Sequence, residues 1–227
     1  SDGMHSIEEM AMACKTKGYE YLVMSDHSVS SFYANGLSIE RIRLQQEEIE
    51  RLNEKLFPFR IFKSIECDIL GEGQLDYPDK VLSSFDLVIA SVHQNLKMTE
   101  EKAMQRLLRA VENPYTRILG HPSGRLLLSR KPYPIDYETL IEHCAQHDVV
   151  IEINANPRRL DLDWQWIPLA TEKKVMLSVN PDAHSTDGIN DIRYGVLFAQ
   201  KGMLTAANNL SSLSLTEFEN WLKSKKA

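Results

Sequence analysis

Four histidines of the chain follow directly after short apolar runs that are typical of buried strands: His27, His93, His121 and His184. Asp182 stands two residues before His184, and Glu66 lies near the end of another such run. Imidazole and carboxylate side chains together form the nitrogen and oxygen ligand sets that Zn, Mn and Fe accept. Two cations about 3.5 to 4 Å apart can clamp a phosphoryl group and activate a water molecule. These residue types therefore point to hydrolysis of a phosphate ester.

The elements that must position these residues alternate along the chain. We expect strands at 19–25, 60–69, 87–92, 116–119, 149–154 and 175–179. We expect helices at 7–14, 38–56, 78–84, 100–111, 136–146 and 215–225, and a partly helical segment at 162–173. This order predicts an α/β fold with a parallel sheet, whose carboxyl edge would gather the polar residues around one cavity. A barrel is a better prediction than an open doubly wound sheet, because the chain has neither a GxGxxG nor a Walker loop.

Length and composition favour a single domain over residues 1–227. The chain has 227 residues, 43% of them hydrophobic and 26% charged, and a formal net charge of −6. That charge argues against a domain that grips duplex DNA through a large basic field. The three cysteines lack CxxC spacing, and no apolar run approaches the roughly 18 residues of a membrane span, so a reducing cytoplasm is the simplest setting.

Other polar residues allow two interpretations each. Arg125 and Arg159 follow strand ends and are the preferred contacts for substrate phosphate, because a guanidinium fork matches phosphate oxygens; pairing with nearby acidic residues is the competing interpretation. His143 and His147 stand four residues apart on a predicted helix, a spacing compatible with metal binding. Since no HExxH motif surrounds them, we interpret them as a surface pair or a helix cap.

Three aromatic residues, Tyr133, Trp164 and Trp166, are candidates for stacking on a nucleobase. For the two tryptophans, packing in the core or in a loop is the favoured interpretation.

Five short motifs surround the candidate ligands in chain order: Ser25-Asp26-His27-Ser28, Glu66-Cys67-Asp68-Ile69, Ala90-Ser91-Val92-His93, Gly120-His121-Pro122 and Asp182-Ala183-His184-Ser185. Together they resemble the motifs of the polymerase and histidinol phosphatase (PHP) superfamily. Further segments are similar to the C-terminal PHP domain of bacterial family X DNA polymerases: Leu75-Asp76-Tyr77-Pro78, His121-Pro122-Ser123-Gly124-Arg125, Glu152-Ile153-Asn154-Ala155-Asn156-Pro157 and Arg159-Leu160-Asp161-Leu162. The similarity runs through nearly the whole chain.

The resemblance implies a distorted seven-stranded (β/α) barrel with a centre of two or three divalent metal ions, which are Zn, Mn or Fe. It also implies metal-dependent phosphoesterase activity, which in family X polymerases is a manganese-stimulated 3′-5′ exonuclease. The implied partners are DNA 3′ ends or another phosphate ester, and an upstream polymerase domain in the same chain.

Carried over by position, the resemblance makes Glu66 the bridging ligand and places it with His93 and Asp182 in the catalytic set. His93 and His121 would complete one metal site, and Asp182 would serve another. Asp2, His27 and His184 would hold the third metal.

The family's first motif, His-x-His at the end of its first strand, would stand just before Ser1 and is absent from this sequence. We interpret the chain as a C-terminal fragment of a longer polymerase that lacks the first barrel strand; true loss of the motif is the alternative. Two other functions stay open. One is a small-molecule phosphate monoesterase of the histidinol phosphatase type, and the other is a catalytically degraded, metal-stabilised interaction domain.

Overall fold

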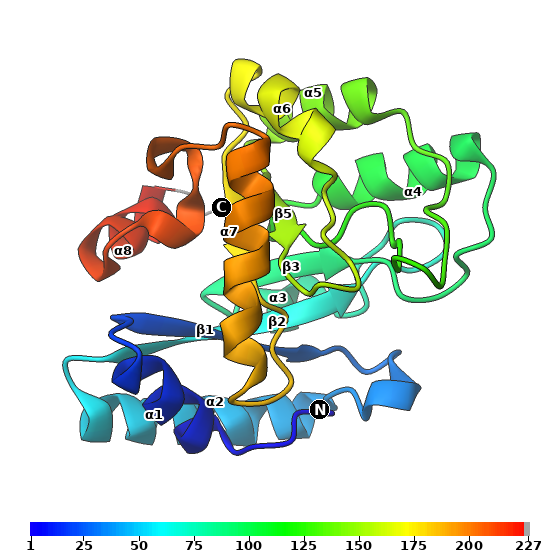
Figure 1. Cartoon of the computed structure of the whole chain (residues 1–227). Helices are drawn as coiled ribbons and strands as arrows, with labels where there is room; N and C mark the ends of the chain where they lie inside the picture. Colours follow the sequence, from blue (N-terminus) through cyan, green and yellow to red (C-terminus); the bar gives the residue numbers. More distant parts are fainter. Residues whose placement is uncertain (225–227) are drawn as a thin grey trace.

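The computed structural model describes residues 1–224 and contains one parallel sheet of six strands (Figure 1). The strands are β1 (Tyr21–His27), β2 (Arg60–Asp68), β3 (Leu87–Ser91), β4 (Thr116–Leu119), β5 (Val150–Asn154) and β6 (Leu177–Asn180). They pair in sequence order, and every pair is parallel. The α/β class and the parallel sheet are therefore confirmed. A strand order that never reverses is that of a barrel, whereas doubly wound sheets reverse at a switch point.

The sheet is open between β1 and β6 in the described part of the chain, where six strands are present. The seven-stranded barrel that the family resemblance implies is thus matched in strand direction and order, and its seventh strand is not among residues 1–224. The N-terminal segment lies at this opening. The Met4 amide donates to the His184 carbonyl at 2.8 Å, and the His27 amide donates to the Ser1 hydroxyl at 3.2 Å.

Eight α-helices connect and cover the strands in the described residues: α1 (Ile7–Thr16), α2 (Ile39–Leu56), α3 (Asp79–Leu82), α4 (Glu100–Val111), α5 (Tyr137–His147), α6 (Ile167–Glu172), α7 (Ile192–Lys201) and α8 (Leu215–Ser224). Figure 1 shows α1 and α2 side by side below β1, with α4, α5 and α6 gathered toward the opposite end of the sheet. Most begin or end within two residues of the sequence prediction; Lys225, the predicted end of the last helix, lies outside the described residues. None of the described helices combines the length and apolar character needed to cross a membrane.

Local capping explains why several helices begin where they do. Ser6 and Glu9 form a complete capping box at the start of α1. The side chains of Ser38, Thr99 and Asp136 accept hydrogen bonds from backbone N–H groups in the first turns of α2, α4 and α5. Each such cap satisfies an N–H group that the helix itself leaves unpaired.

Helix α7 was not predicted from the sequence. Gly195 lies in its middle, and glycine costs about 1 kcal/mol relative to alanine in a helix interior. The structure shows why glycine is needed: a Cβ at this position would lie 2.4 Å from the Ala155 Cβ and 2.7 Å from Val179 Cγ1. Close packing of α7 on β6 and on the end of β5 therefore requires Gly195. The same glycine has a low helix propensity, which is why the sequence did not predict this helix.

One face of the sheet changes from apolar to polar along the strands. At the amino end, α8 packs its Phe218 against a buried apolar layer made of Phe62, Leu87, Ile118 and Val150. Alternate residues of a strand share a face, so Ser64, Glu66 and Asp68 follow Phe62 along β2 on the same side. Apolar packing thus closes the amino end of this face and leaves polar groups at its carboxyl end.

Candidate metal centre

The Glu66 carboxylate lies among three imidazoles at the carboxyl edge of the sheet. Its Oε1 is 3.2 Å from His93 Nε2 and 2.9 Å from His121 Nε2, and its Oε2 is 3.4 Å from His27 Nδ1. The sheet register explains this convergence, because His27 pairs with Glu66 across β1 and β2. His93 and His121 follow the next two strands within two residues. The structure therefore brings together four residues that the sequence analysis selected.

His27 also belongs to a second, adjoining group. Asp2 Oδ1 lies 4.0 Å from His27 Nε2, and Asp2 Oδ2 lies 3.6 Å from His184 Nε2. The potential ligand atoms of Asp2, His27 and His184 lie within 4.8 Å of one another, and the same holds for His27, Glu66 and His93. Two groups that share one residue have the arrangement needed for neighbouring cations.

The donor atoms of this centre fit a divalent transition metal. His27 Nδ1 and His93 Nε2 are buried and have no hydrogen-bond partner in the described structure. A buried polar nitrogen without a partner is costly, and imidazole nitrogen with carboxylate oxygen is a ligand set for Zn, Mn or Fe. The residues present therefore suit the class of metal that the sequence predicted.

Asp182 lies beside these groups. Its Oδ2 accepts a hydrogen bond from Asn154 Nδ2 at 3.0 Å and lies 3.6 Å from Arg159 Nε. Its Oδ1 is 3.8 Å from His184 Nδ1. The described residues thus place Asp182 at the edge of the centre, in contact with an amide and a guanidinium, and in neither of the two three-residue groups.

The charges of Glu66 and His93 are set by competition between burial and neighbouring groups. Burial alone would raise the pKa of Glu66, but His93 and His121 outweigh it and hold the pKa well below its usual value. Burial alone would lower the pKa of His93, but Glu66 and Asp68 raise it to about 10. Burial lowers the pKa of His121, which favours its neutral, metal-binding form. Metal binding to His93 must therefore compete with a tightly held proton.

Asp68 orients the His93 ring and was missed as a site residue. Its Oδ1 hydrogen-bonds His93 Nδ1, while its Oδ2 accepts from the hydroxyls of Ser30 and Ser31 at 2.6 and 2.9 Å. Such a carboxylate fixes which ring nitrogen faces the metal. The sequence carried a signal, because residues two apart on a strand share a face and Asp68 follows Glu66 at that spacing.

Glu152 is a second residue without a predicted role. It is buried on β5, and its carboxylate accepts from the His121 amide at 2.7 Å and from Asn180 Nδ2 at 2.9 Å. Burial, with Asp182 nearby, raises the pKa of Glu152 to about 8. An acidic residue in the middle of the apolar run VVIEIN was the available signal. Glu152 holds the backbone of His121, whose φ is 24°.

The two arginines predicted to contact phosphate have different surroundings. Arg125 donates through Nε to the Arg159 carbonyl at 2.9 Å, and its two other nitrogens contact Asp163 and the Leu160 carbonyl. Each of its three nitrogens thus donates to the protein. Arg159 keeps a buried Nη1 without a hydrogen-bond partner in the described structure, next to Asp182.

The aromatic residues singled out in the sequence are used in packing. Trp166 stacks on Tyr137 with ring centroids 4.6 Å apart, and Lys201 Nζ lies 4.2 Å from the centre of the Trp164 ring. Tyr133 is buried and donates its hydroxyl to the Pro122 carbonyl at 2.6 Å. The two tryptophans are used in packing, as the sequence analysis favoured. Tyr133 is buried, so the prediction that it stacks on a nucleobase is wrong.

A different aromatic pair lies at the rim of the centre. Phe32 and Tyr33, in the short 3-10 helix after β1, are 83% and 67% exposed. The Tyr33 ring is 6.1 Å from the His27 ring. Their position five and six residues after His27, the first strand-end histidine, was the signal in the sequence.

Comparison with known proteins places the chain among phosphoesterases. No family model matches it. It is 44% identical over 223 residues to the DNA polymerase/3′-5′ exonuclease PolX of Bacillus subtilis, covering 98% of this chain and 39% of PolX. It is 30% identical over 159 residues to a probable phosphatase of Caldanaerobacter subterraneus, covering 66% of this chain and 56% of that protein. The chain thus spans less than two thirds of each relative.

The fold is similar to that of a histidinol phosphate phosphatase from Lactococcus lactis, which was crystallised with Zn, L-histidinol and phosphate. The TM-score is 0.63 over 90% of both chains, at 15% sequence identity. Motifs in order, similarity to PolX over nearly the whole chain and this shared fold agree with one another. The chain belongs to the PHP superfamily.

Proposed function

We propose that the chain is the 3′-5′ exonuclease module of a family X DNA polymerase. The observation that carries this proposal is the Glu66 carboxylate among three strand-end imidazoles, adjoined by the group of Asp2, His27 and His184. Similarity to PolX over 98% of the chain supports it. We infer two or three divalent cations, which are Zn, Mn or Fe, and a PHP domain that spans residues 1–227. The seven-stranded barrel of the family belongs to this proposal.

An upstream polymerase domain is the proposed partner within one longer polypeptide, because the chain spans 39% of PolX. The cysteines of the described chain, Cys14, Cys67 and Cys144, are free and buried, which suits the reducing cytoplasm in which such an enzyme would work.

Each proposed site residue has a role that follows from its contacts. Bound cations would supply Lewis-acid polarisation of the phosphoryl oxygens and a more acidic water. Glu66, His93 and His121 would hold one cation, and Asp2, His27 and His184 another; these six are the proposed ligands, with Asp182 as a further ligand beside His184. Glu66, His93 and Asp182 remain the proposed catalytic set.

Arg159 is the preferred contact for substrate phosphate. Its Nη1 makes no hydrogen bond in the described structure, whereas each of the three nitrogens of Arg125 already donates to the protein. Arg125 would then support Arg159, because it binds the Arg159 carbonyl.

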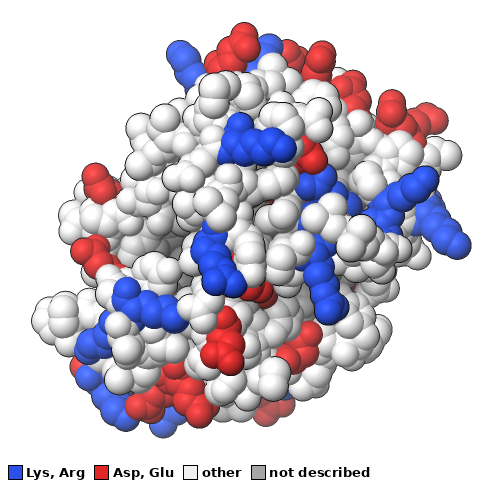
Figure 2. Space-filling view, viewed as in Figure 1, with Lys and Arg blue, Asp and Glu red and all other residues white. Residues whose placement is uncertain are grey.

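The surroundings of the centre favour a single-stranded or frayed DNA end. Figure 2 shows Lys and Arg side chains interspersed with acidic ones on the face drawn, without a continuous basic surface of the kind that binds a long duplex. The exposed faces of Phe32 and Tyr33 next to His27 suit stacking of terminal bases, which is largely independent of sequence.

The test is release of nucleotides from single-stranded DNA labelled at its 5′ end, with Mn²⁺ added. We expect stepwise shortening from the 3′ end, and a loss of roughly 100-fold or more in Glu66→Gln and in His93→Ala, since each removes a proposed ligand. Glu54→Gln is the matched control, because Glu54 is exposed on α2. Full activity in Glu66→Gln or His93→Ala would contradict the proposal.

A second substrate separates the exonuclease from a monoesterase. In a Phe32→Ala/Tyr33→Ala variant we expect roughly tenfold or greater loss on single-stranded DNA, because stacking contributes about 1–3 kcal/mol per base. Hydrolysis of p-nitrophenyl phosphate should be unchanged. Robust hydrolysis of the monoester with none of DNA in the parent protein would favour the small-molecule phosphatase. Absence of both activities in metal-loaded protein would favour an interaction domain.

A further inference from the structure

Two helices that flank the sheet bring three potential metal ligands together. His143 and His147 lie one turn apart on α5, with ring centroids 4.5 Å apart. Glu112 is the C-cap residue of α4, which packs against α5, and its Oε1 lies 3.3 Å from His143 Nε2. The potential ligand atoms of these three residues lie within 4.8 Å of one another.

The separation of these atoms matches a coordination shell. A tetrahedral metal with bonds of about 2.0–2.1 Å to nitrogen and oxygen holds its ligand atoms about 3.3 Å apart. His143 Nε2 and Glu112 Oε1 already have this spacing. Yet His143 Nε2 is buried and makes no hydrogen bond in the described structure, so its lone pair or proton is unsatisfied. His147 is exposed and can adjust its ring at little cost.

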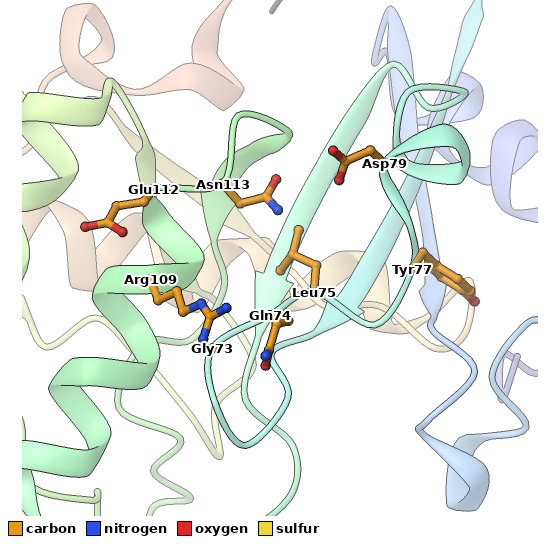
Figure 3. Close-up of a pocket in the computed structure, with 8 residues that line it drawn as sticks. All are labelled: Gly73, Gln74, Leu75, Tyr77, Asp79, Arg109, Glu112 and Asn113. Carbon is orange, nitrogen blue, oxygen red and sulfur yellow. The ribbon is translucent and has the colours of Figure 1, made fainter.

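This cluster is separate from the centre around Glu66. Glu112 stands just before β4 and His147 just before β5, so the cluster lies at the amino edge of the sheet, whereas the centre around Glu66 lies at the carboxyl edge. Glu112 is also turned away from nearby positive charge. Glu112 and Arg109 both line a cavity of about 310 Å³, and in Figure 3 the Glu112 carboxylate points away from the Arg109 guanidinium.

We propose that Glu112, His143 and His147 bind one divalent transition-metal ion of the zinc type, which ties α4 to α5. Two imidazoles and one carboxylate leave a fourth position for water, and imidazole selects Zn, Cu and Ni over Mg or Ca. The ion would satisfy His143 Nε2 and link the end of α4 to the end of α5.

The test is calorimetric titration of the 227-residue protein, freed of metal, with Zn²⁺. We expect a His143→Gln/His147→Gln variant to bind one equivalent fewer than the parent protein. A Glu66→Gln/His93→Ala variant should keep that equivalent, which assigns it to α4 and α5. His147→Gln alone should weaken this equivalent by roughly tenfold or more, since it removes one of three protein ligands. Glu138→Gln, on the same helix, is the control and should bind as the parent does.

Thermal unfolding gives a second readout. Zn²⁺ should raise the unfolding temperature of the Glu66→Gln/His93→Ala variant, and the rise should become smaller when His147→Gln is added. An unchanged number of equivalents and unchanged affinities in His143→Gln/His147→Gln would overturn the proposal. If the double variant does not fold, His147→Gln alone still tests the proposal, because His147 is exposed and its replacement should not disturb packing.

Discussion

At the scale of single residues, Glu152 connects the apolar interior to the metal centre. Its carboxylate bonds the His121 amide and the Asn180 side chain, and it faces the carboxylates of Asp182 and Glu66. Burial and these two acids raise the pKa of Glu152 to about 8, so at neutral pH its folded form keeps a proton that an unfolded chain would lose.

We therefore predict that the contribution of Glu152 to the free energy of unfolding of the metal-free protein falls as pH rises from about 4.5 to about 8. In that window the folded state binds more protons at Glu152 than the unfolded state does, so stability declines with a slope of up to roughly 1.4 kcal/mol per pH unit. Above pH 8 both states are ionised and the contribution stays lost. Urea unfolding in EDTA at several pH values measures this pH dependence of the free energy of unfolding.

Glu152→Gln is the matched control for this titration, because glutamine keeps the shape and an acceptor oxygen but does not ionise. His93, whose raised pKa also weakens the metal-free fold as pH rises, is present in both proteins, so the difference between the two curves isolates Glu152. Parallel curves for the parent and the variant would show that Glu152 does not hold this proton.

At the scale of elements, α4 fixes two loops that follow site-bearing strands. Arg106 of α4 is 2% exposed. Its Nε donates to the carbonyls of Ile69 and Leu70 at 3.1 and 2.9 Å, and its Nη1 donates to the Gln94 carbonyl at 2.9 Å. Ile69 follows β2, which carries Glu66, and Gln94 follows His93 directly. One buried guanidinium thus sets the relative positions of two strand ends.

Arg106→Leu should lower the free energy of unfolding by roughly 3 kcal/mol, because it leaves three carbonyls without their charged donor. We also expect a several-fold loss of hydrolysis, since His93 loses its support. Arg109→Leu is the control one turn further along α4. Arg109 donates to the Glu72 carbonyl near the surface at 3.1 Å, and its replacement should cost less than about 1 kcal/mol. Denaturant unfolding of both variants measures these losses. Equal losses of unfolding free energy in the two variants would contradict the role of Arg106.

At the scale of the whole molecule, the metal centre joins parts of the chain that the sheet alone does not join. The loop after β6 and the N-terminal segment meet at His184 and Met4, across the open side of the sheet. Asp2, His27 and His184 lie there, and Glu66 links them to β3 and β4 through His93 and His121. Cations bound at this place would close the structure across its open side.

Saturating Mn²⁺ should therefore raise the unfolding temperature, and EDTA should lower it again. At a metal concentration of 100 times Kd the expected gain is about 2.7 kcal/mol. The measurement belongs in a His143→Gln/His147→Gln background, so that the site between α4 and α5 does not contribute. Glu54→Gln should keep the gain and Glu66→Gln should lose most of it; the same gain in both would place the stabilising metal elsewhere.

The sequence by itself determined the order and type of most elements. Capping residues such as Ser38 and Thr99, and apolar runs of strand length, act over a few neighbouring positions, so they can be recognised locally. The same local reasoning placed His27, Glu66, His93 and His121 at strand ends, and a parallel sheet must bring such ends to one edge. That is why the convergence of the centre could be predicted before any distance was known.

Only the tertiary structure decided how individual side chains are used. The donors of Arg125 are occupied by Asp163 and by carbonyls from a distant loop, and Tyr133 is buried against Pro122. Helix α7 depends on Gly195 fitting against Ala155. Each of these outcomes depends on partners far away in the chain, whose positions are set by packing. The sequence shows which polar groups and surfaces a chain carries. Which of them find a partner inside the protein depends on the residues that packing brings next to them.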